Sequence, residues 1–355
     1  MSFELTKEDT DLIKKHGLLP YLSNDEIAKR TLDDIDKERS GEQLGLFSSW
    51  QKVNIAMGKY CRFNTINLWA APTGHGKSFI LTQLEDDFTD IRLAHGKDIN
   101  GEIIEIKGIN YGFSKEVVII HFGFEMDAED EFVRSLSRVI AKSTHWIRSA
   151  EWVEEDLAYN KITDKEFAFI SNQIKYLEGR NIYFIERIGN VYQMYATILN
   201  IKSQHPNAEL VIDLDHTLLT KREDGQSDGE VIQAVAFFAL AVRKRFGAML
   251  NIIAQCNSKL EDINRISKPA LHGTKLSDIY FNAQINWVCD NVWIMHRPEL
   301  FNIEHYSTDK IDATDLVVFN CVKSRRGKLG EVLMKNYLHR GRFVEFNPHT
   351  DIPQN

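Results

Sequence analysis

The stretch Ala71-Pro-Thr-Gly-His-Gly-Lys77-Ser78 decides the fold of this chain. It fits the phosphate-loop pattern G-x-x-x-x-G-K-[ST], with Ala at the first position. Gly74 and Gly76 allow backbone N–H groups to converge on phosphate oxygens. The Lys77 amine then reaches the β- and γ-phosphates, and the Ser78 hydroxyl ligates Mg²⁺. We therefore expect ATP and Mg²⁺ as ligands, held by Thr73, Gly74, His75, Gly76, Lys77, Ser78 and Phe79.

The sequence on either side of the loop predicts the fold class. Apolar runs typical of buried strands occupy residues 66–71, 117–124, 210–212, 249–254, 291–295 and 316–320. Stretches with helical spacing lie between them, at residues 78–88, 128–143, 164–177, 191–203 and 231–246. Continuous apolar strands separated by helices are typical of a mostly parallel sheet covered on both faces. We expect an α/β domain of this kind.

The first 45 residues are rich in charge and differ from the rest of the chain. Ser23 and Glu26 have the spacing of a capping box, which starts a helix. Ile27, Leu32 and Ile35 follow as one narrow apolar stripe. The stripe has two interpretations, packing on the chain's own domain or on a neighbouring subunit. We expect a short helical arm over residues 1–45, the ATPase domain over 46–347 and a tail over 348–355.

Composition limits the function classes. The net charge of −8 means that any contact with nucleic acid must come from a local basic surface. The four cysteines show no C-x-x-C spacing, which favours free thiols in a reducing compartment. The sequence contains no signal peptide and no run of 18 apolar residues, so we expect no membrane contact and a cytoplasmic location.

Carboxylates follow two of the expected strands. Asp213 ends the run Leu210-Val-Ile-Asp213, where an Asp holds Mg²⁺ in enzymes with a phosphate loop. Asp215 is its rival for this role. Glu125 follows the run 117–124 and is placed to polarise a water for attack on the γ-phosphate. The residues alone leave Glu125 equally well explained as a solvated side chain at the start of a helix.

A basic turn, Lys323-Ser-Arg325-Arg326-Gly327-Lys328, follows the last long apolar run. Such a turn is usually a solvated surface feature. The alternative is that Lys323 and Arg325 reach the phosphates of a nucleotide on another subunit.

These motifs, in this order, resemble the DnaB-type replicative helicases, a branch of the RecA-like ATPases, over roughly residues 44–346. Phe122-Gly-Phe-Glu125-Met126 is similar to the family's Phe-Ser-Leu-Glu-Met, which implies that Glu125 is the catalytic glutamate. Ala254-Gln255-Cys-Asn257 is similar to Ser-Gln-Leu-Asn, whose Gln senses the γ-phosphate. Lys323-Ser-Arg325-Arg326-Gly327 is similar to the Lys-x-Arg-Asn-Gly hairpin, which implies that Lys323 and Arg325 act in trans.

The resemblance implies a three-layer RecA-like core and an ATP-dependent helicase or translocase. It also implies a homo-oligomer, expected to be a hexamer, that moves on single-stranded DNA and has a primase or helicase loader as partner. The family's amino-terminal primase-docking domain is not expected here, which favours a phage-like system. The expected DNA-binding residues are Lys221, Arg222, Lys259, Arg265, Lys268 and Lys275. A RecA-like recombinase and a non-helicase ATPase switch that assembles with a protein partner are the alternatives.

Overall fold

The computed structural model describes residues 6–17, 22–97, 103–155, 157–222, 224–280 and 282–348. The chain divides into two compact units, Met1–Leu44 and Gly45–Asn355, and each is treated by itself below. The expected tail over 348–355 lies, apart from its first residue, outside the described residues.

The first unit contains the two helices α1 (Lys7–His16) and α2 (Asn24–Arg39). The capping box at the start of α2 is present: Glu26 N–H donates to Ser23 Oγ at 3.2 Å, and Ser23 N–H donates to Glu26 Oε2 at 2.7 Å. Ile27, Leu32 and Ile35 are each about half exposed or more, so the apolar stripe of α2 faces solvent within this unit. The helical character expected of the arm is confirmed.

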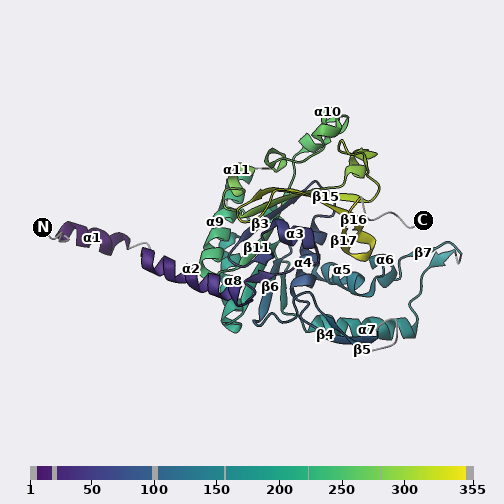
Figure 1. The fold of residues 1–355 in the computed structure, drawn as a ribbon, viewed down its shortest axis with the longest axis horizontal. Helices are drawn as coiled ribbons and strands as arrows, with labels where there is room; N and C mark the ends of the chain where they lie inside the picture. The colour runs from purple at the N-terminus through teal and green to yellow at the C-terminus, as the bar shows by residue number, and fades with distance from the viewer. Residues whose placement is uncertain are drawn as a thin grey trace. The chain divides into compact units, whose positions relative to one another are not determined.

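A nine-stranded sheet forms the centre of the second unit, within the part of the chain that the structure describes (Figure 1). Its strand order is β17 (Arg342–Glu345), β16 (Gly330–Tyr337), β15 (Leu316–Ser324), β12 (Asn291–His296), β3 (Ile66–Ala71), β11 (Met249–Gln255), β10 (Glu209–Leu214), β6 (Val117–Phe122) and β9 (Ile182–Ile185). From β12 to β9 neighbouring strands are parallel, whereas β15, β16 and β17 pair antiparallel. The expected mostly parallel sheet is confirmed.

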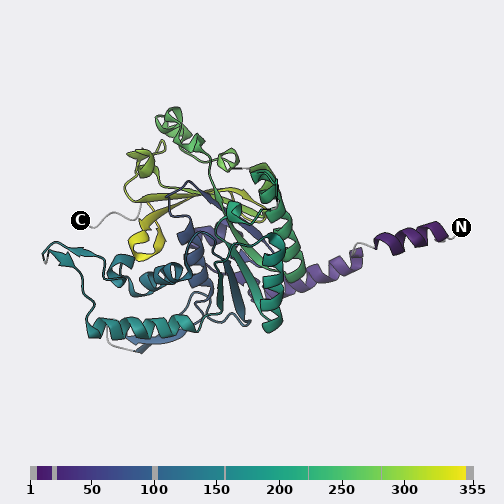
Figure 2. The same ribbon diagram turned by 180° about the vertical axis from the view of Figure 1, so that it is seen from behind.

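Helices cover both faces of this sheet, which gives three layers (Figures 1 and 2). On one face α8 (Val191–Gln204) and α9 (Asp228–Phe246) pack on the strands. On the other face α3 (Gln51–Ala56) and α4 (Ser78–Phe88) do so, with α5 (Ala128–Ile140) against α4 and α7 (Asp164–Glu178) against α5. The helix expected over 128–143 ends at Ile140 because Ala141 turns left-handed, with φ 55°.

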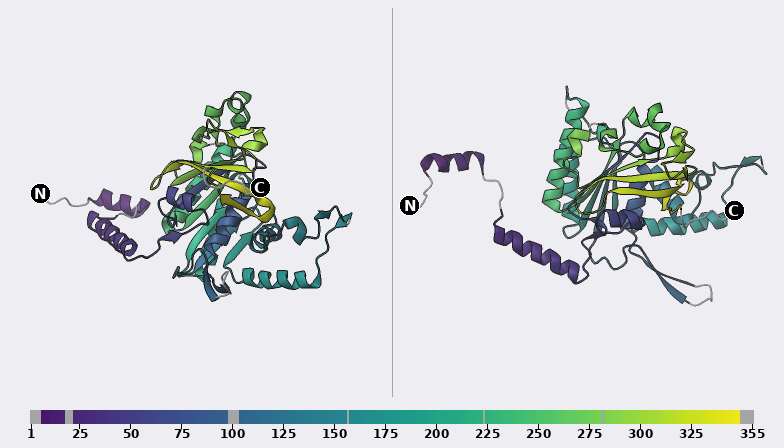
Figure 3. Two further views of the ribbon diagram at one scale, coloured as in Figure 1. Left: turned by 45° about the vertical axis from the view of Figure 1, so that its right-hand side comes forward. Right: turned by 45° about the horizontal axis from the view of Figure 1, so that its top comes forward.

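Smaller elements complete the unit. They are β1 (Gly45–Leu46), β2 (Cys61–Arg62), β4 (Leu93–Lys97), β5 (Ile103–Lys107), α6 (Thr144–Ile147), β7 (Trp152–Val153), β8 (Ala158–Tyr159), α10 (Ile263–Ile266), α11 (Asn282–Ile285), β13 (His305–Tyr306) and β14 (Ile311–Asp312). The β4–β5 hairpin and the β7–β8 ribbon project from the body of the unit (Figure 3). Among the described residues no helix is both long and apolar enough to cross a bilayer.

The basic turn after β15 is packed against α3. Lys328 N–H donates to Ala56 O at 2.9 Å, and Gly327 lies so close that a Cβ there would be 1.8 Å from the same oxygen. Only glycine fits at this contact, because any side chain would collide with backbone. The turn is therefore held on the domain surface and is not a free solvated loop.

Candidate functional site

The phosphate-loop residues join β3 to α4 and keep their backbone donors available. Gly74 and Gly76 have φ of +80° and +93°, and a Cβ on Gly76 would lie 2.7 Å from Leu338 Cδ1. In the described chain the N–H groups of Gly76, Lys77 and Ser78 have no hydrogen-bond acceptor. Unpaired N–H groups at a helix start are the donors that a bound phosphate needs. The donor set of the loop therefore fits a nucleotide with Mg²⁺.

His75 is in the loop, but its side chain turns away from the loop surface. The ring is buried, packs 4.8 Å from the Phe301 ring, and accepts a hydrogen bond from Arg297 N–H at 2.9 Å through Nδ1. Burial and the Arg297 charge lower the pKa of His75 to about 4, so the ring is neutral at pH 7. Only the backbone of this residue can face a phosphate, which narrows the expectation that His75 binds the nucleotide.

The carboxyl ends of β3 and β6 bring the loop lysine and Glu125 together. Lys77 Nζ lies 3.6 Å from Glu125 Oε2, and the lysine side chain is 6% exposed. Glu125 is 41% exposed, so water can reach its carboxylate. These two groups come from positions 48 residues apart, and their meeting is the central feature of the site.

The two aspartates of β10 occupy different depths of the sheet. Asp213 pairs with Asn251, which pairs with Asn67, and Asn67 precedes the strand end at Ala71 by four residues, or about 13 Å. Its carboxylate is fully buried and lies beside Glu85, which is seven residues and about 10 Å beyond Ser78 along α4.

Asp215 lies on the same face two residues nearer the loop. Its Oδ1 accepts from Phe124 N–H at 3.0 Å and its Oδ2 from Glu125 N–H at 2.9 Å. Burial raises the pKa of this carboxyl. The depth of Asp213 disfavours it as a partner of Ser78, and the position at the strand edge belongs to Asp215.

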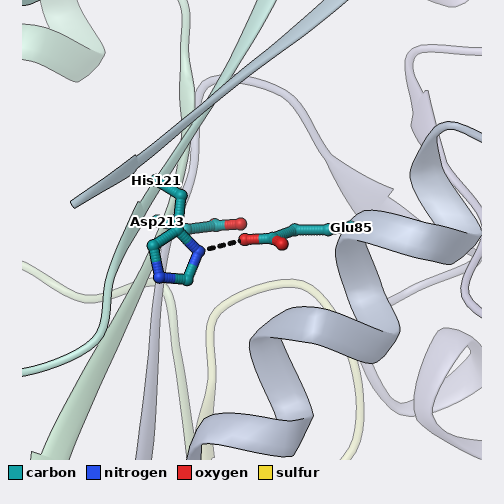
Figure 4. A group of neighbouring side chains, drawn as sticks. All are labelled: Glu85, His121 and Asp213. Carbon is teal, nitrogen blue, oxygen red and sulfur yellow. Dashed lines mark hydrogen bonds and ion pairs between the residues drawn. The ribbon is translucent and has the colours of Figure 1, made fainter. Parts of the chain in front are cut away.

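Asp213 instead joins a buried cluster with Glu85 and His121 beneath α4 (Figure 4). Burial disfavours the charged imidazole, but the Glu85 carboxylate against His121 Nδ1 raises the histidine's pKa to about 10. Burial and the nearby Glu85 raise the pKa of Asp213. Glu85 and His121 contact each other directly, so no space for a cation separates them. The cluster is a charge-compensated core group and does not fit a metal centre.

Gln255 and His216 extend the site from the neighbouring strands. Gln255 pairs with Ala71, directly before the loop, and its Nε2 donates to His216 Nε2 at 2.8 Å. Burial lowers the pKa of His216, and the Lys77 charge acts in the same direction. The neutral ring can therefore accept this hydrogen bond, and the expected γ-phosphate sensor lies at the loop.

Lys323 and Arg325 lie at the opposite edge of the sheet. Ser324 pairs with Asn291, which pairs with Asn67, because β15 runs antiparallel to β12. Arg325 Nη1 is 3.1 Å from Asp290 Oδ1 and its side chain is 47% exposed. Lys323 Nζ donates to Asn286 O, and burial lowers the pKa of this amine. Neither residue reaches the phosphate loop of its own chain.

The expected DNA-binding residues fall on loops at the same edge as the phosphate loop. Lys221, Lys259, Lys268 and Lys275 are exposed. Arg222 is also exposed but pairs with Asp228 at 2.5 Å. Arg265 is different, because its two terminal nitrogens each lie 2.8 Å from an oxygen of Asp278 and its Nε donates to Leu271 O. Arg265 holds its own loop together, so the structure disfavours it as a phosphate contact.

Comparison with solved structures identifies the architecture. A solved structure of an isolated ATPase domain matches with a TM-score of 0.67 at 16% identity, over 90% of this chain and 98% of that chain. A DnaB-like replicative helicase, described with its interactions with primase, matches with a TM-score of 0.69 at 16% identity, over 96% of this chain and 71% of that chain.

This chain has the fold of a DnaB-like helicase ATPase domain.

No family model and no curated protein matches the sequence. The DnaB-like fold therefore rests on the three-dimensional likeness.

Sequence reasoning missed the residues that surround Asp213 in the DnaB-like core. Asn67, Asn251 and Asn291 are buried, as are His121 and Glu85. The available signal was one asparagine inside each of three apolar strands, where Asn is unfavourable without a partner. Each strand shows one such residue, but only the register reveals that they are neighbours.

The histidines around the loop predict an acid-sensitive fold. Burial lowers the pKa of His296 from 6.5 to about 3, so the unfolded chain takes up its proton first as pH falls below 6.5. Stability is therefore lost from about pH 6.5 downwards. In His296→Phe the free energy of unfolding should fall less steeply between pH 6 and 4, by about 1.4 kcal/mol per pH unit. Denaturant titrations at several pH values measure this slope.

The matched control is His145→Phe, because His145 is exposed in the folded protein. Its slope should equal that of the wild type. Parallel pH curves for wild type and His296→Phe would contradict the neutral, buried assignment of His296.

Proposed function

We propose that this protein is an ATP-dependent DNA helicase or translocase of the DnaB type that hydrolyses ATP at subunit interfaces. The observation that carries the proposal is the 3.6 Å approach of Lys77 Nζ to Glu125 Oε2. A cation that neutralises phosphate and a carboxylate that activates water are the two groups that phosphoryl transfer to water needs side by side.

In this account each residue of the pocket has a separate task. The loop N–H groups and Lys77 hold the phosphates, and Glu125 accepts a proton from the attacking water. Gln255, oriented by His216 at 2.8 Å, contacts the γ-phosphate. Ser78 and Asp215 hold Mg²⁺, which when bound neutralises phosphate charge. Asp215 replaces the expected Asp213 because it lies nearer the strand edge.

Catalysis in trans follows from the separation of the two sets of groups. Lys323 and Arg325 lie across the sheet from their own loop, at the far end of β15. In a ring, the turn of one subunit can meet the phosphate loop of the next, and a positive charge supplied in this way can be worth about 10³-fold or more. A hexamer is the assembly that the DnaB-like fold favours.

The moving contacts with single-stranded DNA are assigned to Lys221, Lys259, Lys268 and Lys275. Their loops follow β10 and β11, the strands that carry Asp215 and Gln255. Hydrolysis can therefore act on them over a short path. A primase or helicase loader is the proposed protein partner, and the cytoplasm the proposed location. An ATPase stimulated by single-stranded DNA without strand exchange separates this function from a recombinase or an ATPase switch.

Glu125→Gln tests the catalytic glutamate. The amide keeps the shape but cannot accept a proton, so kcat should fall on the order of 10²-fold or more while ATP binding persists. Phosphate release and equilibrium binding of labelled ATP measure the two quantities. Glu129→Gln, in the first turn of the nearby helix α5, is the matched control and should leave kcat unchanged. Normal turnover in Glu125→Gln would remove this residue from the mechanism.

Paired variants of β10 decide which aspartate serves Mg²⁺. Asp215→Asn should raise the Mg²⁺ concentration needed for half-maximal ATPase activity at least about 10-fold, since a charged ligand is removed. Asp213→Asn should instead lower thermal stability, because it changes a buried charge cluster, with little change in Mg²⁺ dependence. Magnesium titrations and thermal melts distinguish the variants. The reverse pattern would restore Asp213 as the ligand residue.

Charge reversal tests the DNA loops. Lys268→Glu with Lys275→Glu should weaken single-stranded DNA binding and reduce the slope of log K against log salt by about 0.7 for each phosphate that is no longer bound. Fluorescence anisotropy over a salt series measures both. Lys244→Glu with Arg245→Glu makes the same charge change at the end of α9, on the opposite edge of the sheet, and serves as control. Equal effects of the two pairs would mean that the loops do not face DNA.

A further inference from the structure

A row of polar side chains crosses the sheet in a single register. His121, Asp213, Asn251, Asn67, Asn291 and Ser324 are successive Cα partners on β6, β10, β11, β3, β12 and β15. The five residues before Ser324 are at most 6% exposed. Each stands among apolar residues of its own strand. Buried polar groups at six adjacent positions need a common reason, because each costs free energy unless it is paired.

Hydrogen bonds link five of these side chains into one chain. Ser324 Oγ donates to Asn291 Oδ1 at 2.9 Å, and Asn291 Nδ2 donates to Asn67 Oδ1 at 2.9 Å. Asn67 Nδ2 donates to Asn251 Oδ1 at 3.0 Å, and Asn251 Nδ2 donates to Asp213 Oδ1 at 2.9 Å. Every donor points towards Asp213. Hydrogen bonds aligned in one direction strengthen each other in a low-dielectric core.

The two ends of the row are attached to the two halves of the proposed catalytic site. At one end Gly327 N–H donates to Ser324 Oγ at 2.9 Å, inside the turn that carries Lys323 and Arg325. At the other end Asp213 lies in the cluster with Glu85, a residue of α4, and α4 begins directly after the phosphate loop. The row thus joins the turn offered to one neighbour with the helix that holds the chain's own nucleotide.

We propose that Asn67, Asn251 and Asn291 are positioning residues, which fix the turn at 323–327 relative to α4 so that Arg325 meets the next subunit's nucleotide at the correct distance. This inference rests on the proposed function. Ordinary apolar packing would serve stability as well, but amide hydrogen bonds fix orientation and register in addition. Because a group misplaced by about 1 Å can cost on the order of 10²-fold in rate, such a fixed connection has a use at a shared site.

Asn67→Ala tests the proposal in the full-length protein, because Asn67 is at the middle of the row and touches neither nucleotide nor turn. The variant should lower kcat about 10-fold or more, through the misplacement of Arg325, and leave KM for ATP within about 2-fold. In the Arg325→Ala background the same change should have almost no further effect on kcat, since the positioned group is gone. Steady-state ATPase assays with single-stranded DNA give all four values.

Leu68→Ala is the matched control. Leu68 is the next residue of β3, is fully buried, and packs on the other face of the sheet. Its effect on kcat should multiply independently with that of Arg325→Ala. Independent effects for Asn67→Ala, or equal non-additivity for Leu68→Ala, would overturn the positioning role.

Ser324 supplies a second route if Asn67→Ala does not fold. Ser324→Ala removes the link between the row and Gly327 N–H, and Ser324→Thr keeps the hydroxyl. The alanine variant should show the kcat loss and the non-additivity with Arg325→Ala, and the threonine variant should recover activity. Full activity in Ser324→Ala would overturn the inference. Full activity in Arg325→Ala alone would instead contradict catalysis in trans, so the two failures are distinguishable.

Discussion

The contact between Lys77 and Glu125 is the interaction on which the rest of this account depends. It exists only because β3 and β6 run parallel in one sheet, with β11 and β10 between them, so that the loop and the glutamate leave at the same edge. Asp215 N–H and carboxylate contacts hold the Glu125 segment from the intervening strand. A pocket for phosphate transfer follows from this arrangement of strand ends, and the helices on both faces serve to keep it in register.

Much of the fold was predictable from the sequence because continuous apolar runs and a glycine-rich loop are local signals. The strand Ile66–Ala71 and the helix Ser78–Phe88 have the bounds that the pattern predicts. The candidate site was less accessible. Asp213 and Asp215 share a face and differ by two residues, so only pairing with Asn251 shows which one is deep in the core. Likewise, Arg265 looks like a free cation until its contacts with Asp278 are seen.

A second constraint is the distance between the phosphate loop and the basic turn. Because β15 is antiparallel to β12, Lys323 and Arg325 are presented at the edge opposite Lys77. A single chain therefore holds two halves of a site that cannot meet within it. The polar row from Ser324 to Asp213 spans the sheet between these halves, and its fixed hydrogen-bond direction gives a physical reason for buried amides in otherwise apolar strands.

Subunit mixing tests the central claim, hydrolysis at a site shared between subunits, most directly. Arg325→Ala subunits keep an intact pocket, and Glu125→Gln subunits keep an intact turn, so each preparation alone should be nearly inactive. Mixed and reassembled, some interfaces pair a wild-type Glu125 with a wild-type Arg325. ATPase activity should therefore rise well above the sum of the two preparations when assembly is verified by mass. Activity that stays at that sum in verified mixed assemblies, or full activity of Arg325→Ala alone, would contradict the account.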